Sequence, residues 1–310
     1  MASSERLSSL AAVGATREVL QAHGLVTKHA LGQNFLVNDD VIKKIADLAG
    51  LVPDDFVLEV GPGIGTLTEA LLKRSGHVVS IERDRDLPAV LEGTLVEWAD
   101  RFALIQKDAL DLQETDLDAA CSQLGLSADE RPNKFVSNLP YAVAATIILD
   151  FFERFSFVDS ATVMVQREVG ERIMAMPGTK NYGAYTVKLS LFAKPVDKFL
   201  VSPGNFFPPP HVESMVVRLD RHQVVDADGS ALSPEQRAAA CVMADASFTN
   251  RRKTIANSCK AYFASRGDDV AAKALPQMLA ACGIEPSRRG ETLSQVEFIA
   301  LGKAYLALER

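Results

Sequence analysis

The sequence predicts an α/β fold, in which a doubly wound and largely parallel sheet is followed by a smaller all-α domain. Between residues 56 and 165, short β-rich apolar runs alternate with segments of helical periodicity. This alternation is typical of a parallel sheet that is covered by helices on both faces. From about Asp220 no strand candidate remains, and four helical segments follow in succession. The chain of 310 residues also exceeds the usual size of one domain.

Each predicted strand is a short apolar run that ends in glycine or polar residues. Two late runs, at 199–201 and 215–219, have little helix between them and are predicted to form an antiparallel hairpin. The five earlier strands are predicted at residues 56–60, 77–81, 102–106, 134–137 and 161–165.

The helices are predicted from apolar spacing and from their end signals. Residues 16–24 form a short helix that ends at a glycine, and Asn38 or Asp39 is placed to cap the next helix. We therefore predict an α/β domain over residues 1–220, helix 16–24 included, and a helical domain over residues 221–310. The remaining predicted helices span residues 66–74, 234–247, 254–265, 269–282 and 294–308.

The composition is that of an ordinary globular protein, with 47% hydrophobic and 24% charged residues. No apolar run approaches the roughly 20 residues that span a bilayer, and residues 7–13 make a poor signal peptide, so a cytoplasmic protein is expected. The four cysteines are scattered without a C-x-x-C pair, and neither a zinc site nor a disulfide framework is predicted. No motif indicates an oligomer, so a monomer is expected.

The charge is unevenly distributed along the chain. The net charge is −7, yet residues 251–273 hold six basic and two acidic residues. A local basic patch can bind phosphates in spite of the overall sign. The alternative is a solvated helix face. The candidates for phosphate contacts are Arg251, Arg252, Lys253 and Lys260.

The polar motifs of the α/β domain follow predicted strands, and doubly wound sheets bind ligands at the carboxyl ends of their strands. The first motif is Gly-Pro-Gly-Ile-Gly at residues 61–65. Glycines allow a sharp turn and a close approach of the backbone to a ligand. A dinucleotide-binding loop would need its third glycine at the position of Thr66, so the spacing argues against a pyrophosphate site. A tight turn without a ligand is the alternative.

Two acidic residues end the next two strands. Glu82 lies 21 positions after Gly61, where an acid can accept hydrogen bonds from both ribose hydroxyls of a nucleoside cofactor. Asp108 could accept from an adenine amino group, or could simply cap a helix. The two positions together favour a nucleoside ligand.

The segment Asn138-Leu139-Pro140-Tyr141 gives the most specific signal. The amino nitrogen of adenine is a poor nucleophile because its lone pair is delocalised into the ring. The Asn138 side-chain oxygen and the Leu139 carbonyl could accept its two N–H bonds, so that the lone pair points at a methyl donor. Tyr141 would stack on the base, and Pro140 would stiffen the turn. Phe206, in a Phe-Phe-Pro-Pro-Pro run, could cover the other face of the base.

Together these residues resemble the ribosomal RNA adenine dimethyltransferase family, and most closely its bacterial small-subunit members. The resemblance runs from about residue 16 to residue 306. Asparagine often follows the tyrosine in that family, whereas this chain has Ala142, and residues 143–146 are also atypical. The matching segments are 31–36 (Leu-Gly-Gln-Asn-Phe-Leu), 59–68, Glu82, 107–110 (Lys-Asp-Ala-Leu), 138–141, 166–169 (Gln-Arg-Glu-Val), 182–183 (Tyr-Gly), Phe206-x-Pro-x-Pro with Val212 and Ser214, and 248–254 (Phe-x-Asn-Arg-Arg-Lys-Thr).

The resemblance implies a seven-stranded, Rossmann-like methyltransferase. Its implied cofactor is S-adenosylmethionine, and its implied reaction is N6,N6-dimethylation of two adjacent adenosines near the 3′ end of small-subunit (16S) ribosomal RNA. Residues 1–220 would then be catalytic, and residues 221–310 would bind RNA within an assembling 30S particle. No metal is implied. By similarity the cofactor contacts are Asn34, Leu36, Gly61, Gly63, Glu82, Asp108 and Asn138.

Three other functions are weighed against this one. A ribosome-assembly checkpoint factor would bind an immature subunit without catalysis. Relatives that methylate large-subunit RNA usually carry isoleucine in place of Leu139 and lack a segment like 250–254. DNA adenine methyltransferases commonly have Asp-Pro-Pro-Tyr at this strand end, so Asn138 argues against that class.

Overall fold

The computed structural model describes residues 6–26, 33–127, 129–226 and 228–308. Its contacts divide the chain into two compact units. The first comprises the chain up to Gly170 together with Pro195–Arg221, and the second comprises Glu171–Lys194 together with the chain from His222 onward. The chain therefore passes between the units three times. The division predicted from the sequence did not set residues 171–194 apart from the α/β domain.

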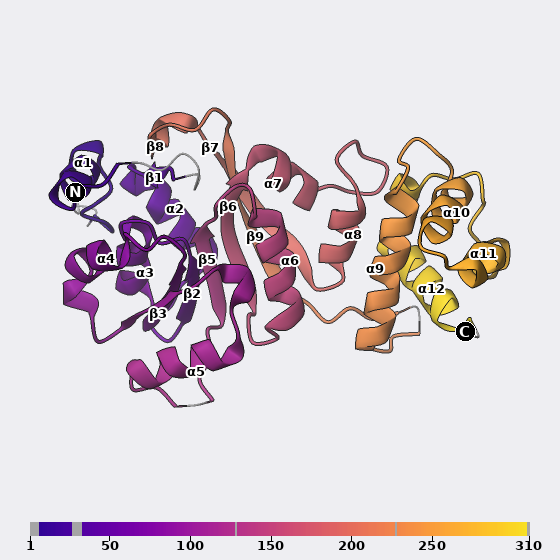
Figure 1. Ribbon diagram of the computed structural model, residues 1–310, viewed down its shortest axis with the longest axis horizontal. Helices are drawn as coiled ribbons and strands as arrows, with labels where there is room; N and C mark the ends of the chain where they lie inside the picture. Colours follow the sequence, from indigo (N-terminus) through magenta and orange to yellow (C-terminus); the bar gives the residue numbers. More distant parts are fainter. Residues whose placement is uncertain (1–5, 27–32, 128, 227, 309–310) are drawn as a thin grey trace. The chain divides into compact units, whose positions relative to one another are not determined.

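The first unit is built around a seven-stranded mixed sheet with strand order β4-β3-β2-β5-β6-β9-β7 (Figure 1). The strands from β2 to β6 run parallel to their neighbours, and β9 runs antiparallel to β6. The predicted doubly wound sheet is thus confirmed. The strands are β2 (Phe56–Val60), β3 (His77–Glu82), β4 (Phe102–Gln106), β5 (Lys134–Asn138), β6 (Ser160–Gln166), β7 (Ala193–Val201) and β9 (Ser214–Arg221).

Helices cover both faces of this sheet because the strand order reverses between β2 and β5. Right-handed crossovers then place the helices on opposite faces on the two sides of that point. Leu71 of α3 (Thr66–Arg74) packs with Val136 on one face, and Phe151 of α6 (Ala144–Arg154) meets the neighbouring Phe135 on the other, with ring centroids 5.0 Å apart. The reversal leaves a crevice at the carboxyl ends of β2 and β5.

Five further helices belong to this part of the chain, and the last of them continues past Gly170 into the second unit. Asn38 caps α2, since its side chain accepts a hydrogen bond from the Asp40 amide at 2.9 Å. The first helix begins three residues earlier than predicted. These helices are α1 (Val13–Ala22), α2 (Asp39–Ala49), α4 (Pro88–Thr94), α5 (Glu114–Gln123) and α7 (Arg167–Ile173), with 3-10 turns at Val96–Trp98, Ala109–Asp111 and Pro203–Asn205.

A second, two-stranded sheet joins distant parts of the first unit. β1 (Phe35–Leu36) pairs antiparallel with β8 (Phe206–Phe207), with Phe35 opposite Phe207 and Leu36 opposite Phe206. Two residues are too few to show a strand period, so this pairing was not predicted. It holds the segment before α2 against the loop that precedes β9.

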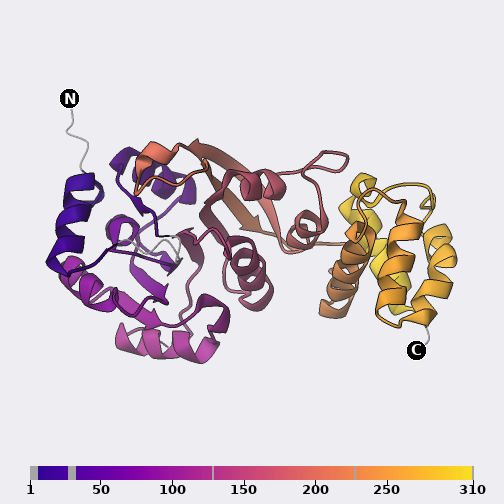
Figure 2. The same cartoon turned by 45° about the horizontal axis from the view of Figure 1, so that its top comes forward.

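The second unit is helical (Figure 2). Helix α12 crosses α9 so closely at Gly302 that a Cβ there would lie 2.6 Å from the Ala240 amide nitrogen. Lys188 of α8 forms an ion pair with Asp245 of α9 at 2.8 Å, which explains why residues 171–194 belong to this unit. The predicted C-terminal helices are confirmed. They are α9 (Pro234–Phe248), α10 (Ile255–Ser265), α11 (Asp269–Ala281) and α12 (Gln295–Leu306), joined by α8 (Ala184–Ser190) and a 3-10 turn at Gly290–Thr292.

In the parts of the chain that the structure describes, no helix is both long enough and apolar enough to cross a membrane.

Candidate active site

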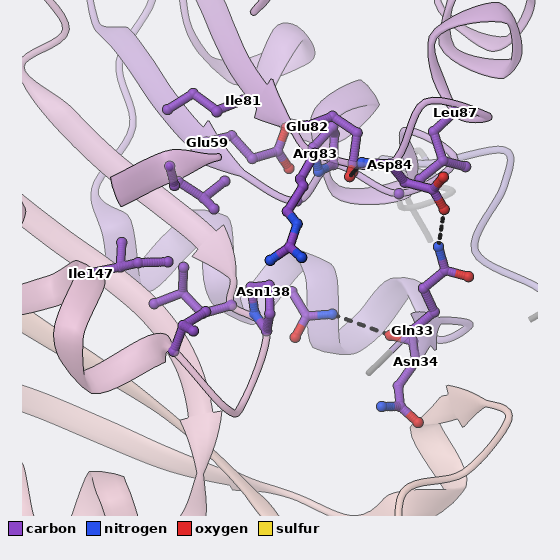
Figure 3. Close-up of a pocket in the computed structure, with 18 of the residues that line it drawn as sticks. Gln33, Asn34, Glu59, Ile81, Glu82, Arg83, Asp84, Leu87, Asn138 and Ile147 are labelled. Carbon is purple, nitrogen blue, oxygen red and sulfur yellow. Dashed lines mark hydrogen bonds between the residues drawn. The ribbon is translucent and has the colours of Figure 1, made fainter. Parts of the chain in front are cut away.

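A cavity of about 510 Å³ lies at the carboxyl ends of β2, β3, β4 and β5 (Figure 3). Its walls come from the loop that follows each of these strands and from the segment around β1. Most of the residues predicted from the sequence line it together. They are Asn34, Leu36, Gly61, Gly63, Glu82, Asp108, Asn138, Leu139, Pro140 and Tyr141.

The conformation of the glycine loop between β2 and α3 requires residues with a positive φ. Gly63 has a φ of 61°, and a Cβ there would lie 3.0 Å from the Phe35 ring. Any larger residue would therefore be strained and would also push against β1. The glycine brings the backbone against the cavity, where it can approach a ligand.

The side-chain hydroxyl of Thr66 lies at the start of α3. The residue is only 4% exposed and lines the cavity, yet its Oγ1 has no hydrogen-bond partner among the described residues. A buried polar atom without a partner is costly, and the positive end of the helix dipole attracts a carboxylate at the same place. The site therefore fits a ligand that carries an α-carboxylate, as the methionine part of S-adenosylmethionine does.

Glu59 is a buried carboxyl at the floor of the cavity. Its side chain is 1% exposed and accepts hydrogen bonds from Ser80 at 2.7 Å and from Thr68 at 2.8 Å. Burial raises the pKa of Glu59 to about 7, and the nearby charge of Glu82 adds to the rise. The carboxyl thus changes charge near neutral pH, close to where a cofactor would lie.

Glutamine at position 59 is expected to change how stability depends on pH. Because the folded pKa of about 7 exceeds the ordinary 4.5, the stabilising contribution of the protonated form is present below pH 4.5. It is lost as the pH rises through 7. The free energy of unfolding of the parent protein should fall by roughly 3 kcal/mol, relative to Glu59→Gln, between about pH 5 and about pH 8. Urea unfolding of both proteins at the two pH values measures this difference, and parallel pH profiles would contradict it.

Glu82 presents a carboxylate at the end of β3. It is 7% exposed and accepts the Asp84 amide at 2.7 Å, and burial raises its pKa. Asp84 in turn accepts a hydrogen bond from the Gln33 side chain at 2.8 Å (Figure 3). These hydrogen bonds connect the segment before β1 to the end of β3. The Glu82 carboxylate lines the cavity, where it can accept hydrogen bonds from ribose hydroxyls.

The orientation of the Asn138 side chain is fixed by a hydrogen bond from its amide nitrogen. Its Nδ2 donates to the Asn34 carbonyl oxygen at 3.2 Å (Figure 3). Since the nitrogen is engaged, this orientation presents the side-chain oxygen as the group that accepts from a ligand. Tyr141 lies three residues further on, and its hydroxyl forms a hydrogen bond with the Ser214 hydroxyl at 2.6 Å. Burial raises the pKa of the Tyr141 hydroxyl, so the phenol stays neutral.

The comparisons with known proteins agree along nearly the whole chain. The family model described as ribosomal RNA adenine dimethylase matches residues 25–301. The chain belongs to this family. It is 37% identical to the ribosomal RNA small subunit methyltransferase A of Geobacter metallireducens, over 93% of this chain and 99% of that protein. It is 36% identical to the protein of the same name in Enterococcus faecalis, over 93% and 94% of the two chains.

Solved structures show the same fold. A dimethyladenosine transferase from Plasmodium falciparum superposes with a TM-score of 0.69 at 21% identity, and 86% of this chain and 95% of that chain are covered. The 23S rRNA methyltransferase ErmE gives a TM-score of 0.58 at 24% identity, over 87% and 99% of the two chains. At these identities the likeness concerns the fold alone.

The dimethylase does not place Phe206 at the cavity, contrary to the prediction. Phe206 is 3% exposed and packs in the hydrophobic core beside Leu36, its partner across β1 and β8. The adjacent Phe207 is half-buried and lies 4.9 Å from the Arg17 guanidinium, and it does not line the cavity either. The strand pairing turns Phe206 inward, and the sequence could not show that.

The four predicted RNA-binding residues lie in the second unit and all are exposed. Arg251 differs from the other three because it is engaged within that unit. It forms an ion pair with Glu291 at 3.0 Å and donates to the carbonyl oxygens of Thr179 and Lys180. These contacts hold the loop before α8 to the turn before α12.

Sequence reasoning missed several cavity residues. Glu59 carries a detectable signal, since a charged residue inside an apolar strand is unusual unless it is partnered. Thr66, Arg83 and Lys107 also line the cavity. Thr66 and Lys107 fall within the matching segments 59–68 and 107–110, but their residue types gave no specific role, because polar residues at strand and helix ends are commonly solvated.

Proposed function

We propose that the chain uses S-adenosylmethionine to dimethylate the N6 atoms of two adjacent adenosines near the 3′ end of small-subunit (16S) ribosomal RNA. The supporting observation is the fixed Asn138 amide, which lies in one cavity with the Glu82 carboxylate and with a Thr66 hydroxyl that has no partner among the described residues. The small-subunit relatives, matched over more than nine-tenths of both chains, support the choice of substrate. We infer from a ribosomal substrate that the enzyme acts in the cytoplasm on the assembling particle, and we expect a monomer because no motif in the sequence indicates an oligomer.

The cofactor would be held at three points along the cavity. The Thr66 hydroxyl and the α3 N-terminus would bind its carboxylate, Glu82 its ribose hydroxyls, and Asp108 its adenine amino group. When bound, S-adenosylmethionine supplies a methyl group on a positively charged sulfur. Gly63, whose backbone is left-handed, would let the loop approach that ligand closely.

The chemistry at the target base would depend on positioning. The Asn138 oxygen and the Leu139 carbonyl would accept the two amino hydrogens and direct the nitrogen lone pair toward the methyl group. Tyr141 would stack on the base after it leaves its RNA partners. After one methylation a single N–H remains, so one acceptor is enough to orient the nitrogen for the second.

A transfer assay tests this function. Labelled methyl from S-adenosylmethionine is supplied to small subunits that lack the modification, and the RNA is digested to nucleosides. Appearance of N6,N6-dimethyladenosine in small-subunit RNA, and its absence from large subunits treated alike, is the expected result. Tight binding of the subunit without transfer would refute the enzymatic function and favour an assembly factor, and transfer to large subunits would refute the substrate.

The basic residues 251–253, which precede α10, are expected to bind RNA phosphates unequally. Arg252 and Lys253 are exposed, and we expect Arg252→Ala combined with Lys253→Ala to flatten the log–log salt dependence of subunit binding by about 1.5. Arg251 is held by Glu291, so Arg251→Ala should weaken binding with an unchanged salt slope, and Glu291→Ala should do the same. Equilibrium binding over a series of KCl concentrations measures both slopes. A flatter slope for Arg251→Ala alone would show that Arg251 contacts phosphate.

A further inference from the structure

Gln166 ends β6 and lines the cavity without a role in the function proposed above. The side chain is half-buried, and its amide forms no hydrogen bond with any residue that the structure describes. A polar group in a cavity loses its hydration when a ligand enters, which costs free energy unless the ligand supplies a partner. The amide is therefore available to a molecule that binds in the cavity.

The strand register places Gln166 beside Tyr141. Met164 lies opposite Asn138 of the neighbouring strand β5, so Gln166 lies two residues beyond that level on the same face of the sheet. In the antiparallel pairing with β9, Gln166 lies directly opposite Ser214. Because Ser214 forms the hydrogen bond with the Tyr141 hydroxyl, the hydroxyl end of the Tyr141 ring lies close to Gln166.

We propose that Gln166 recognises the target adenine, by donating a hydrogen bond from its side-chain amide to a ring nitrogen beside the amino group. The proposal rests on the function proposed above. A base whose amino group lies at Asn138 and whose ring stacks on Tyr141 extends toward the hydroxyl end of that ring, where Gln166 lies. Because β5 lies between β2 and β6, Gln166 approaches the base from the side opposite to the glycine loop.

The neighbouring side chains offer no competing donor. The Tyr141 hydroxyl is engaged by Ser214, and the three lining side chains that follow Tyr141 are apolar. Adenine carries the acceptor nitrogens N1 and N7 on the two sides of its amino group, and flipped bases are recognised by hydrogen bonds to such edges. Gln166 supplies the donor, and the apolar surroundings strengthen the bond. From Tyr141 onward the described lining residues are Tyr141, Ala142, Val143, Ile147 and Gln166.

Methyl transfer to small subunits that lack the modification, at saturating S-adenosylmethionine, tests the proposal. We expect Gln166→Met, which keeps the side-chain length but cannot donate, to lower kcat/KM for the subunit by about 3- to 10-fold. Gln166→Glu should lower it further, because a carboxylate repels the lone pair of the ring nitrogen. The affinity for S-adenosylhomocysteine and the melting temperature should stay unchanged. Gln106→Met is the matched control, since Gln106 ends β4, is exposed and does not line the cavity.

Small subunits reconstituted with 1-deazaadenosine or 7-deazaadenosine at the target positions identify the contact. Each analogue replaces one ring nitrogen with a C–H group, which cannot accept the hydrogen bond. Comparison of the parent protein with Gln166→Met on the same substrate cancels the effect of the analogue on intrinsic reactivity. The loss caused by Gln166→Met should persist on one analogue and vanish on the other, and the analogue on which it vanishes lacks the nitrogen that Gln166 contacts.

The outcomes separate this proposal from the proposed function. If Gln166→Met transfers methyl to adenosine-containing subunits as efficiently as the parent protein, the role of Gln166 is refuted and the proposed function stands. A loss that persists on both analogues would mean that Gln166 contacts the ribose, a phosphate or a neighbouring nucleotide, and the proposal also falls. If the parent protein transfers no methyl to small subunits, the proposed function itself fails, and the recognition of the target base fails with it.

Discussion

Alanine at position 138 is expected to lower the rate of methyl transfer to small subunits by about 10²- to 10³-fold. The lost side-chain oxygen is the group that would draw the adenine amino group into a reactive geometry, and no water molecule would be held there with the same orientation. The measurement is single-turnover transfer at saturating S-adenosylmethionine and subunits, so that binding does not limit the rate. Subunit binding should survive, because Asn138 lies at the cavity and the proposed phosphate contacts are on the second unit.

Aspartate at the same position separates the two functions of the asparagine. Asn138→Asp keeps an acceptor oxygen but cannot donate to the Asn34 carbonyl, so its orientation is lost while its acceptor remains. Its rate should fall between those of the parent protein and Asn138→Ala. If Asn138→Ala retained more than about a tenth of the parent rate, the acceptor would not contribute on the scale of a preorganised catalytic hydrogen bond.

Alanine at position 63 should weaken cofactor binding by about 20- to 100-fold, which corresponds to roughly 2–3 kcal/mol. Its φ of 61° disfavours any side chain, and the added Cβ would press on Phe35 at 3.0 Å. The loop must therefore shift away from the ligand. Titration with S-adenosylhomocysteine and urea unfolding without ligand together measure the change, and we expect both affinity and stability to fall.

Gly93→Ala is the matched control in the same unit. Gly93 lies inside α4 with open space around it, so alanine there should raise stability by about 0.5–1 kcal/mol and leave cofactor affinity unchanged. The two glycine substitutions are thus expected to have opposite signs. Unchanged cofactor affinity in Gly63→Ala would mean that the loop does not contact the ligand.

Much of the fold could be predicted because the central strands are apolar on both faces. β7 shows the limit of that signal. It spans Ala193–Val201, yet only residues 199–201 were predicted, because its middle residues are exposed and include Pro195. Charged residues and proline are typical of an edge strand, where the outer row of backbone groups faces solvent. The β1–β8 pairing has no periodic signal at all.

The site was predictable where function depends on a residue type at a strand end. Glu82, Asp108 and Asn138 fit this description, and all three line the cavity. Phe206 was placed wrongly because two residues show no strand period, so the sequence cannot show that the β1–β8 pairing turns this side chain into the core. Thr66 escaped notice for another reason: a hydroxyl becomes informative only when its surroundings show that it has no partner.

The three passages of the chain between the units bear on how this enzyme could acquire a new specificity. Val187, from the segment Glu171–Lys194, is buried in the same core as Phe298, and Gln295 reaches back to Ser190. Suppose that recombination with a related gene replaced only the chain after Arg221. The new C-terminal helices would then have to pack against the original α8, whose core residues were not selected for them. Replacement of the whole helical unit would therefore require residues 171–194 and the chain from His222 to be exchanged together. Single substitutions within the unit are the easier evolutionary route to a new specificity.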